Sequence, residues 1–182
     1  MILTNRNPMT NTALLIVDVQ NGIAAKKPYA FDEIITNIKK LLEKFRELTL
    51  PVIFVQHDDE VGSELEPGTN GWEIVKEIAP NKKDKVIRKR FNSAFRETTL
   101  EKELHEQGIT TLIIAGMQTE LCIDTTIRVA FEKGFEIIIP EKTNTTINGK
   151  YFSGKEVYEH HNHLFRDRFG RIEAVEEVLK AL

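Results

Sequence analysis

Three side chains of this sequence, a carboxylate, an amine and a thiol, could together perform nucleophilic catalysis. Asp18, Lys89 and Cys122 each follow a short run with the character of a buried strand. In an open parallel sheet the working groups lie beyond the carboxyl ends of the strands, so these side chains would meet at one edge. Each residue alone carries little weight, but the combination is specific. The chemistry that needs it is attack by a thiolate on a carbonyl or related carbon.

The segment around Cys122 suggests how the thiol is activated. Thr119 can act as the N-cap of a helix, which places Cys122 in the first turn. There the helix dipole and the ammonium of Lys89 would both lower the pKa of the thiol. Asp18 can accept the thiol proton and later give it to a leaving amine, as a general base and acid. Backbone amides of the turn before the helix can hold an oxyanion.

The elements that must position these side chains alternate between strand and helix. Apolar and β-branched runs predict six strands, the last of them weaker, at 13–17, 52–55, 85–88, 111–115, 135–139 and 171–175. Apolar periodicity and glycine stops predict helices at 31–48, 98–107 and 119–133. Such alternation gives right-handed crossovers. We therefore expect an α/β fold, a three-layer α/β/α domain around a mainly parallel, Rossmann-like sheet of five to six strands.

The length and charge of the chain fit one globular domain. We expect residues 1–182 to form a single domain, since neither a repeat nor a linker interrupts them. A net charge of -3 without a long basic block gives no footprint for nucleic acid. Residues 1–10 lack the layout of a signal peptide, and no apolar run reaches the length of a membrane span. We expect a cytoplasmic protein that binds neither nucleic acid nor membrane.

The chain has one cysteine, which excludes an internal disulfide and a thiolate-rich zinc site. A free cysteine is more often a small core residue than a nucleophile, so only its context gives Cys122 a chemical interpretation. Residues 18–22 read Asp-Val-Gln-Asn-Gly where a dinucleotide-binding fold has its glycine-rich loop, and no Walker sequence occurs. We therefore expect no cofactor and a small-molecule substrate.

Three spaced motifs resemble those of the isochorismatase-like cysteine hydrolases. They are Leu-Ile-Val-Asp-Val-Gln at 15–20, Val-Ile-Arg-Lys-Arg-Phe-Asn-Ser-Ala-Phe at 86–95, and Ala-Gly-Met-Gln-Thr-Glu-Leu-Cys at 115–122. The resemblance implies the family's catalytic triad at Asp18, Lys89 and Cys122. It also implies a cis peptide bond between Met117 and Gln118, and an oxyanion hole made by the backbone amides of Gln118 and Cys122.

The same resemblance separates two activities. Family members that hydrolyse the vinyl ether of isochorismate lack the nucleophilic cysteine, whereas those that carry it are amidases of the nicotinamidase and carbamoylsarcosine amidohydrolase kind. Cys122 therefore implies hydrolysis of an amide-type C–N bond through a thioester acyl-enzyme. Nicotinamidases also carry Asp-x-His and further histidines after the second strand, where this chain has His57 followed by Asp58 and Asp59. This departure argues against both a metal and nicotinamide.

Several polar and aromatic residues near the active edge are candidates for the substrate pocket. His57 follows the second strand at this edge, where it could line the pocket or form a structural hydrogen bond to a loop carbonyl. A tryptophan stands in a long loop, as core or pocket wall. A phenylalanine lies six residues after the catalytic lysine, and a glutamine is expected to bond near the catalytic carboxylate. The candidates are Gln20, His57, Trp72, Phe95 and Thr119.

The C-terminal third of the chain holds two further patterns. His160, His161 and His163 resemble a metal cluster, but His161 would point away from the face that the other two share, so we expect no metal there. Residues 151–169 contain five aromatic side chains, which are enriched in interface cores. We expect a homo-oligomer, a dimer or larger, that uses this region; helix 119–133 is the other candidate surface.

Two other functions remain open at this point. The protein could be a non-catalytic or scaffold member of the family, whose triad is a buried charge network. It could also hydrolyse a different bond, such as a carbamoyl, hydrazide or vinyl ether bond. Thiol reactivity separates the catalytic from the non-catalytic hypothesis, because an activated Cys122 would be alkylated rapidly near neutral pH and a structural thiol would be inert.

Overall fold

The protein contains seven strands and six α-helices among residues 10–182, the residues that the computed structural model describes. The strands are β1 (Thr12–Val17), β2 (Val52–His57), β3 (Lys85–Lys89), β4 (Thr111–Met117), β5 (Glu136–Pro140), β6 (Asn144–Thr145) and β7 (Arg171–Glu173). The helices are α1 (Asn21–Ala24), α2 (Phe31–Glu47), α3 (Leu100–Glu106), α4 (Asp124–Glu132), α5 (Gly154–Arg168) and α6 (Val175–Ala181). Two short helical segments of other types are η1 (Lys76–Ile78) and η2 (Thr119–Ile123).

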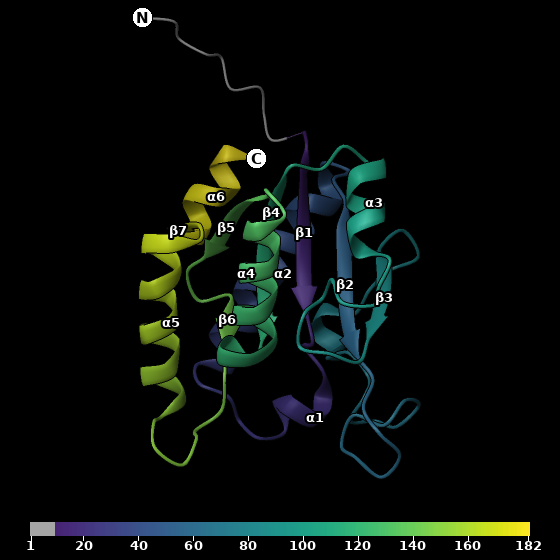
Figure 1. Ribbon diagram of the computed structural model, residues 1–182, viewed down its shortest axis with the longest axis vertical. Helices are drawn as coiled ribbons and strands as arrows, with labels where there is room; N and C mark the ends of the chain where they lie inside the picture. The colour runs from purple at the N-terminus through teal and green to yellow at the C-terminus, as the bar shows by residue number, and fades with distance from the viewer. Residues whose placement is uncertain (1–9) are drawn as a thin grey trace, which may run out of the picture.

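All strands belong to one sheet in the middle of the molecule (Figure 1). Their order is β3-β2-β1-β4-β5-β7, and the short β6 pairs with the end of β4. Every strand pair is parallel. The carboxyl ends of the strands therefore share one edge, the lower edge in Figure 1, and residues that follow different strands meet there.

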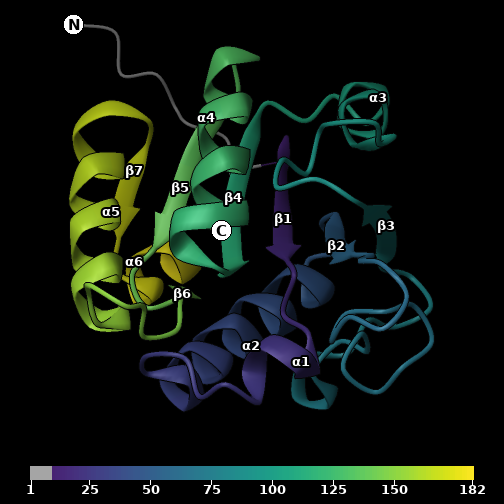
Figure 2. The same ribbon diagram turned by 60° about the horizontal axis from the view of Figure 1, so that its bottom comes forward.

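Helices cover both faces of this sheet (Figure 2). Successive side chains of β1 point to opposite faces, as in any strand. Leu15 and Val17 join a buried cluster with residues of α3, α4 and α5. Leu14 and Ile16 join a second cluster with residues of α2 and α6. Because β1 is buried on both sides, its sequence reads as a continuous apolar run, and the domain has three layers.

The expected fold class is confirmed, with differences at its margins. The sheet has seven strands because β6, two polar residues without an apolar pattern, extends it beside β4. The helix expected at 119–133 is divided into η2, a π-helical turn, and α4. Residues 1–9 of the expected domain, and with them most of the segment expected not to be a signal peptide, lie outside the described residues. Within residues 10–182 the helices are too short or too polar to cross a bilayer.

The aromatic residues of region 151–169 divide between core and surface. Tyr158 and Phe165 are buried, and Phe169 packs partly buried against the core beside α4. Tyr151 and Phe152, in the turn before α5, are 79% and 63% exposed. The part of this region that is free for an interface is therefore its beginning.

Candidate active site

Asp18 follows β1 directly and is turned into the active edge by an unusual backbone. Its φ angle is 53°, in the left-handed region, which is costly for a residue with a side chain and is typical of functional sites. Its N–H donates to the oxygen of Val55, and its own oxygen accepts from the N–H of Gln20. On neighbouring β4, a Cβ at Gly116 would lie 2.0 Å from the oxygen of Val17. Only glycine lets the two strands approach so closely beside Asp18.

Lys89 is the last residue of β3, and its ammonium lies at the centre of the site. Nζ is 2.5 Å from Asp18 Oδ2, 3.3 Å from Cys122 Sγ and 3.0 Å from His57 Nδ1. An ammonium has three N–H donors, so each of these acceptors can take one. The side chain is completely buried. Lys89 is therefore a charge held inside the site, unlike the basic residues around it in the sequence.

Cys122 lies on η2 and is 9% exposed. Burial raises the pKa of its thiol to about 12, with a further increase from the negative charge of Asp18 and a smaller decrease from Lys89. The expectation that the pKa would be lowered is therefore wrong for the resting site, because desolvation of the thiolate outweighs the ammonium. The thiol, and not the thiolate, is therefore the resting form of Cys122.

The carboxyl group of Asp18 is placed to take the thiol proton. It is 1% exposed, and burial raises its pKa, although Lys89 and a hydrogen bond from Cys122 lower it. Oδ2 pairs with Lys89, while Oδ1 has no hydrogen-bond partner among residues 10–182. A buried carboxylate with a raised pKa is a stronger base than one in water. Asp18 and Cys122 therefore form a matched base and nucleophile.

The turn between β4 and η2 contains a candidate oxyanion donor. The peptide bond between Met117 and Gln118 is cis, at the position that the resemblance implies. The oxygen of Gln118 accepts hydrogen bonds from the N–H groups of Leu121 and Ile123, which fixes the beginning of η2. The N–H of Gln118 finds no acceptor in the part of the chain that the structure describes. It is thus available to a carbonyl oxygen bound beside Cys122.

Comparison with known proteins adds a family to this geometry. The family model of the isochorismatase domain matches residues 12–176, most of the chain. The chain belongs to the isochorismatase family. The match begins at β1 and ends in α6, so it includes every strand and every residue of the triad.

Relatives and a solved structure agree with the family match. YddQ, an isochorismatase family protein of Bacillus subtilis, is 35% identical over 140 residues, which cover 74% of this chain and 78% of the relative. Nicotinamidase 3 of Arabidopsis thaliana is 30% identical over 151 residues, with 75% and 74% covered. A crystal structure of an isochorismatase family protein shares 33% identity and a TM-score of 0.86, over 91% of this chain and 99% of that one. Together they support a hydrolase.

Thr119 and Phe95, both expected in the pocket of this isochorismatase domain, lie inside the protein. Thr119 is fully buried, and its hydroxyl donates to Asn144 Oδ1 at 2.8 Å. The N-cap of η2 is Gln118, whose side chain makes no capping bond, so the expected capping role of Thr119 is wrong. Phe95 is 7% exposed and stacks on Phe135 in the core. Both residues hold the scaffold of the site together.

Gln20 and Trp72 fasten the long loop between β2 and β3 to the active edge. The buried amide of Gln20 donates to the backbone oxygens of His57 and Trp72 and accepts from the N–H of His57, all within 3.0 Å. The indole N–H of Trp72 donates to Asp58, whose carboxylate also pairs with Arg88. Gln20 thus bonds beside Asp18 through its backbone N–H and to the end of β2 and the loop through its side chain. It is 0% exposed, so it is not the pocket residue that the sequence suggests, and Trp72 is an anchor of that loop.

Sequence reasoning does not identify three residues that shape the site. Asp58 and Arg88 form the ion pair that holds Trp72, with Arg88 also stacked over the indole. Asn92 is exposed, and its Oδ1 lies 3.9 Å from Cys122 Sγ. The signals for Asn92 in the sequence are its position three residues after Lys89 and its place in the motif at 86–95.

The site also contains residues that could ligate a metal. One ligand atom each of Asp18, His57 and Cys122 lies within 4.8 Å of the others. The ammonium of Lys89 is within 3.3 Å of an atom of all three, so a cation already stands between them. These residues therefore fit a resident metal poorly. On α5, His161 uses Nδ1 in a contact of 3.0 Å with the oxygen of Val157.

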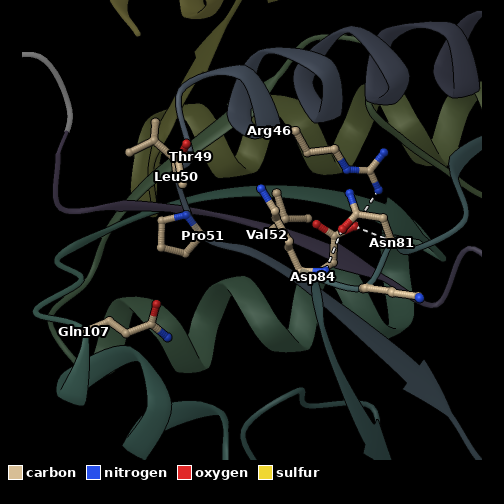
Figure 3. A pocket seen from close by; sticks show the side chains of 10 residues that line it. Arg46, Thr49, Leu50, Pro51, Val52, Asn81, Asp84 and Gln107 are labelled. Carbon is tan, nitrogen blue, oxygen red and sulfur yellow. Dashed lines mark hydrogen bonds and ion pairs between the residues drawn. The ribbon is translucent and has the colours of Figure 1, made fainter.

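A hollow of about 530 Å³ opens at the opposite, amino end of the sheet (Figure 3). An ion pair between Arg46 and Asp84 crosses it. Its lining consists of Arg46, Thr49, Leu50, Pro51, Val52, Asn81, Lys82, Lys83, Asp84 and Gln107. It includes none of the candidate site residues, so it is separate from the triad.

Proposed function

We propose that the protein is a cysteine hydrolase that cleaves an amide-type C–N bond of a small molecule through a thioester on Cys122. The observation that carries the proposal is the ammonium of Lys89, which is completely buried and bonded to both Asp18 and Cys122. Burying an ammonium between a carboxylate and a thiol is costly and serves no evident packing purpose. The arrangement suits a site in which a proton and negative charge move between sulfur and carboxylate.

The reaction begins with Cys122 protonated and Asp18 ionised. As Sγ bonds to the carbonyl carbon, Asp18 takes the thiol proton, and the carbonyl oxygen becomes an oxyanion. The backbone amides of Gln118 and Cys122 are the donors proposed for that oxyanion. When the intermediate collapses, the C–N bond breaks and Asp18 returns the proton to the leaving nitrogen. The products of this half are a thioester and an amine or ammonia.

Water completes the cycle through the same residues. Asp18 accepts a proton from a water molecule as its oxygen attacks the thioester carbonyl. The C–S bond then breaks, the carboxylic acid leaves, and the proton on Asp18 returns to the Cys122 sulfur. The net reaction adds one water molecule to one amide. Lys89 stays protonated throughout and balances the negative charge on whichever of its two partners carries it.

The relatives support this choice of bond. Nicotinamidase 3, by its name, acts on an amide, and it covers three quarters of this chain at 30% identity. Cys122 is a free cysteine, as the proposed nucleophile must be. We further propose that the reaction needs no cofactor and that the substrate enters from the side of Asn92, the exposed neighbour of Sγ.

Release of ammonia or amine from a panel of small amides tests the function. We expect one or more amides to be hydrolysed, Cys122→Ala to reduce turnover by several orders of magnitude, and mass spectrometry of the parent to detect an acyl adduct. His105→Gln, at an exposed position on α3, is a control that should retain activity. Residual turnover of Cys122→Ala within tenfold of the parent would refute the covalent mechanism. A thiol inert to alkylation at every pH would favour a non-catalytic protein.

A further inference from the structure

We propose that His57 positions the substrate by donating a hydrogen bond from Nε2 to an acceptor atom beside the scissile amide. The inference rests on the proposed hydrolase function and adds a requirement for the substrate. Besides the amide that is cleaved, the substrate carries a second hydrogen-bond acceptor, such as a carbonyl or carboxylate oxygen.

Contact with Lys89 decides which ring nitrogen of His57 carries the proton. Nδ1 lies 3.0 Å from Lys89 Nζ. A protonated ammonium has donors and no acceptor lone pair, so Nδ1 is the unprotonated, accepting nitrogen. In a neutral imidazole the proton is then on Nε2. The backbone of His57 is held as well, because its N–H and its oxygen both bond to the amide of Gln20.

Burial, together with the charge of Lys89, keeps the ring of His57 neutral. Burial and the ammonium of Lys89 lower its pKa, and the carboxylates of Asp18, Asp59 and Asp58 oppose this decrease only in part. Since Nδ1 is already occupied by Lys89, the ring has no free nitrogen with which to accept a proton from the substrate. His57 is therefore a hydrogen-bond donor and neither a base nor a cation at neutral pH.

Nε2, the ring nitrogen that does not contact Lys89, is the one left for a ligand. Lys89, the partner of Nδ1, is 2% exposed, whereas His57 itself is half-buried. A ring nitrogen of His57 lies within 4.8 Å of Cys122 Sγ, so the ring adjoins the nucleophile. In the proposed reaction the scissile carbonyl oxygen binds to the backbone amides of Gln118 and Cys122. An Nε2 donor here therefore binds a neighbouring acceptor of the same substrate.

Two substitutions separate this positioning role from a structural one. In His57→Gln the side-chain amide places an N–H donor where Nε2 was. In His57→Asn the amide oxygen takes the place of Nδ1 and can accept from Lys89, but no donor faces the substrate. On the best substrate of the panel we expect His57→Gln to keep KM within about threefold and His57→Asn to raise KM about tenfold at little cost in kcat, the effect of one lost hydrogen bond. If His57 has a purely structural role, His57→Asn keeps KM and His57→Gln raises it, and that result would overturn the inference.

A matched pair of ligands tests the acceptor requirement without depending on turnover. Succinamide carries a second carbonyl that butyramide lacks. Protection of Cys122 against iodoacetamide measures the binding of each. We expect succinamide to protect Cys122 better than butyramide does in the parent and in His57→Gln. In His57→Asn we expect the two amides to protect Cys122 equally. Equal protection by both in the parent, or protection by neither, would overturn the inference.

The proton position has its own readout. In ¹⁵N spectra of histidine-labelled protein, the His57 signals are those lost in His57→Asn. We expect a protonated Nε2 and an unprotonated Nδ1 at neutral pH, and an Nδ1–H tautomer or an imidazolium would contradict the proposal. An inactive Cys122→Ala with an unaffected His57→Asn refutes only this inference, whereas an active Cys122→Ala refutes the proposed function itself.

Discussion

Replacing Asp18 by Asn should change thiol acidity and catalysis in opposite directions. The substitution removes a negative charge that raises the pKa of Cys122 and leaves Lys89, whose charge lowers it, in place. The thiol therefore becomes more acidic. It also loses the base that takes its proton and returns it to the leaving nitrogen, so turnover should fall although more thiolate is present.

The size of the acidity change follows from the distance between the two groups. A carboxylate oxygen of Asp18 lies within 4.8 Å of Sγ. At an effective dielectric constant of about 20, two unit charges at that distance repel by roughly 3.5 kcal/mol, equivalent to about 2.5 pKa units. The pKa of the Cys122 thiol should fall from about 12 to roughly 9.5 on this reckoning. Loss of the general base should lower kcat by about a thousandfold.

The pH dependence of iodoacetamide alkylation measures the first quantity, and amide turnover measures the second. Asp32→Asn, the same change on an exposed helix position, is the matched control and should affect neither. Since Asp18→Asn leaves a buried ammonium unpaired, circular dichroism must verify folding; the double variant with Lys89→Met removes both charges and should fold while staying inactive. A folded Asp18→Asn with turnover within tenfold of the parent, or with an unchanged alkylation midpoint, would refute the reasoning.

Three further outcomes are expected. Lys89→Met should raise the pKa of the Cys122 thiol, the opposite of Asp18→Asn, because the ammonium lowers it; an unchanged alkylation profile would show that this charge does not act on sulfur. Turnover should survive dialysis against a chelator, since an ammonium stands between the potential ligands; recovery of lost activity by zinc would contradict this. Light scattering should give at least twice 20.9 kDa, and Tyr151→Lys should reduce it; a parent near the monomer mass would reject the oligomer.

The triad was accessible from sequence because its prediction needs only strand ends and residue types. Asp18, Lys89 and Cys122 each follow a run whose strand character is plain, and parallel strands must bring such positions to one edge. The left-handed backbone at Asp18 is different, because no pattern around it resembles a turn motif. It depends on hydrogen bonds to Val55 and Gln20, which exist only once the sheet has formed.

The direction in which the pKa of the Cys122 thiol shifts, and the identity of the residues that line the pocket, both depend on burial. A local sequence pattern does not contain that information. A helix start beside a lysine predicts an acidic thiol, but the sulfur of Cys122 is enclosed, and desolvation decides the result. Phe95 stands as near to Lys89 in sequence as a pocket residue would, yet the chain turns it into the core. Trp72 meets Asp58 only because the intervening loop folds back on itself.

That returning loop has a consequence for how new substrate preferences could arise or be engineered. Its first end is held by Asp58, and its last by Trp72 and by hydrogen bonds from residues 21 and 22 to the oxygens of Asn70 and Gly71. Between these ends the stretch 59–69 is anchored again, because Leu65 is buried in the core and Glu64 pairs with Lys26, whereas Val61 is 89% exposed. Exchange of the exposed residues around Val61, with Leu65 and the fixed ends retained, should therefore alter this loop without moving the triad, so chemistry and selectivity can diversify separately on this scaffold.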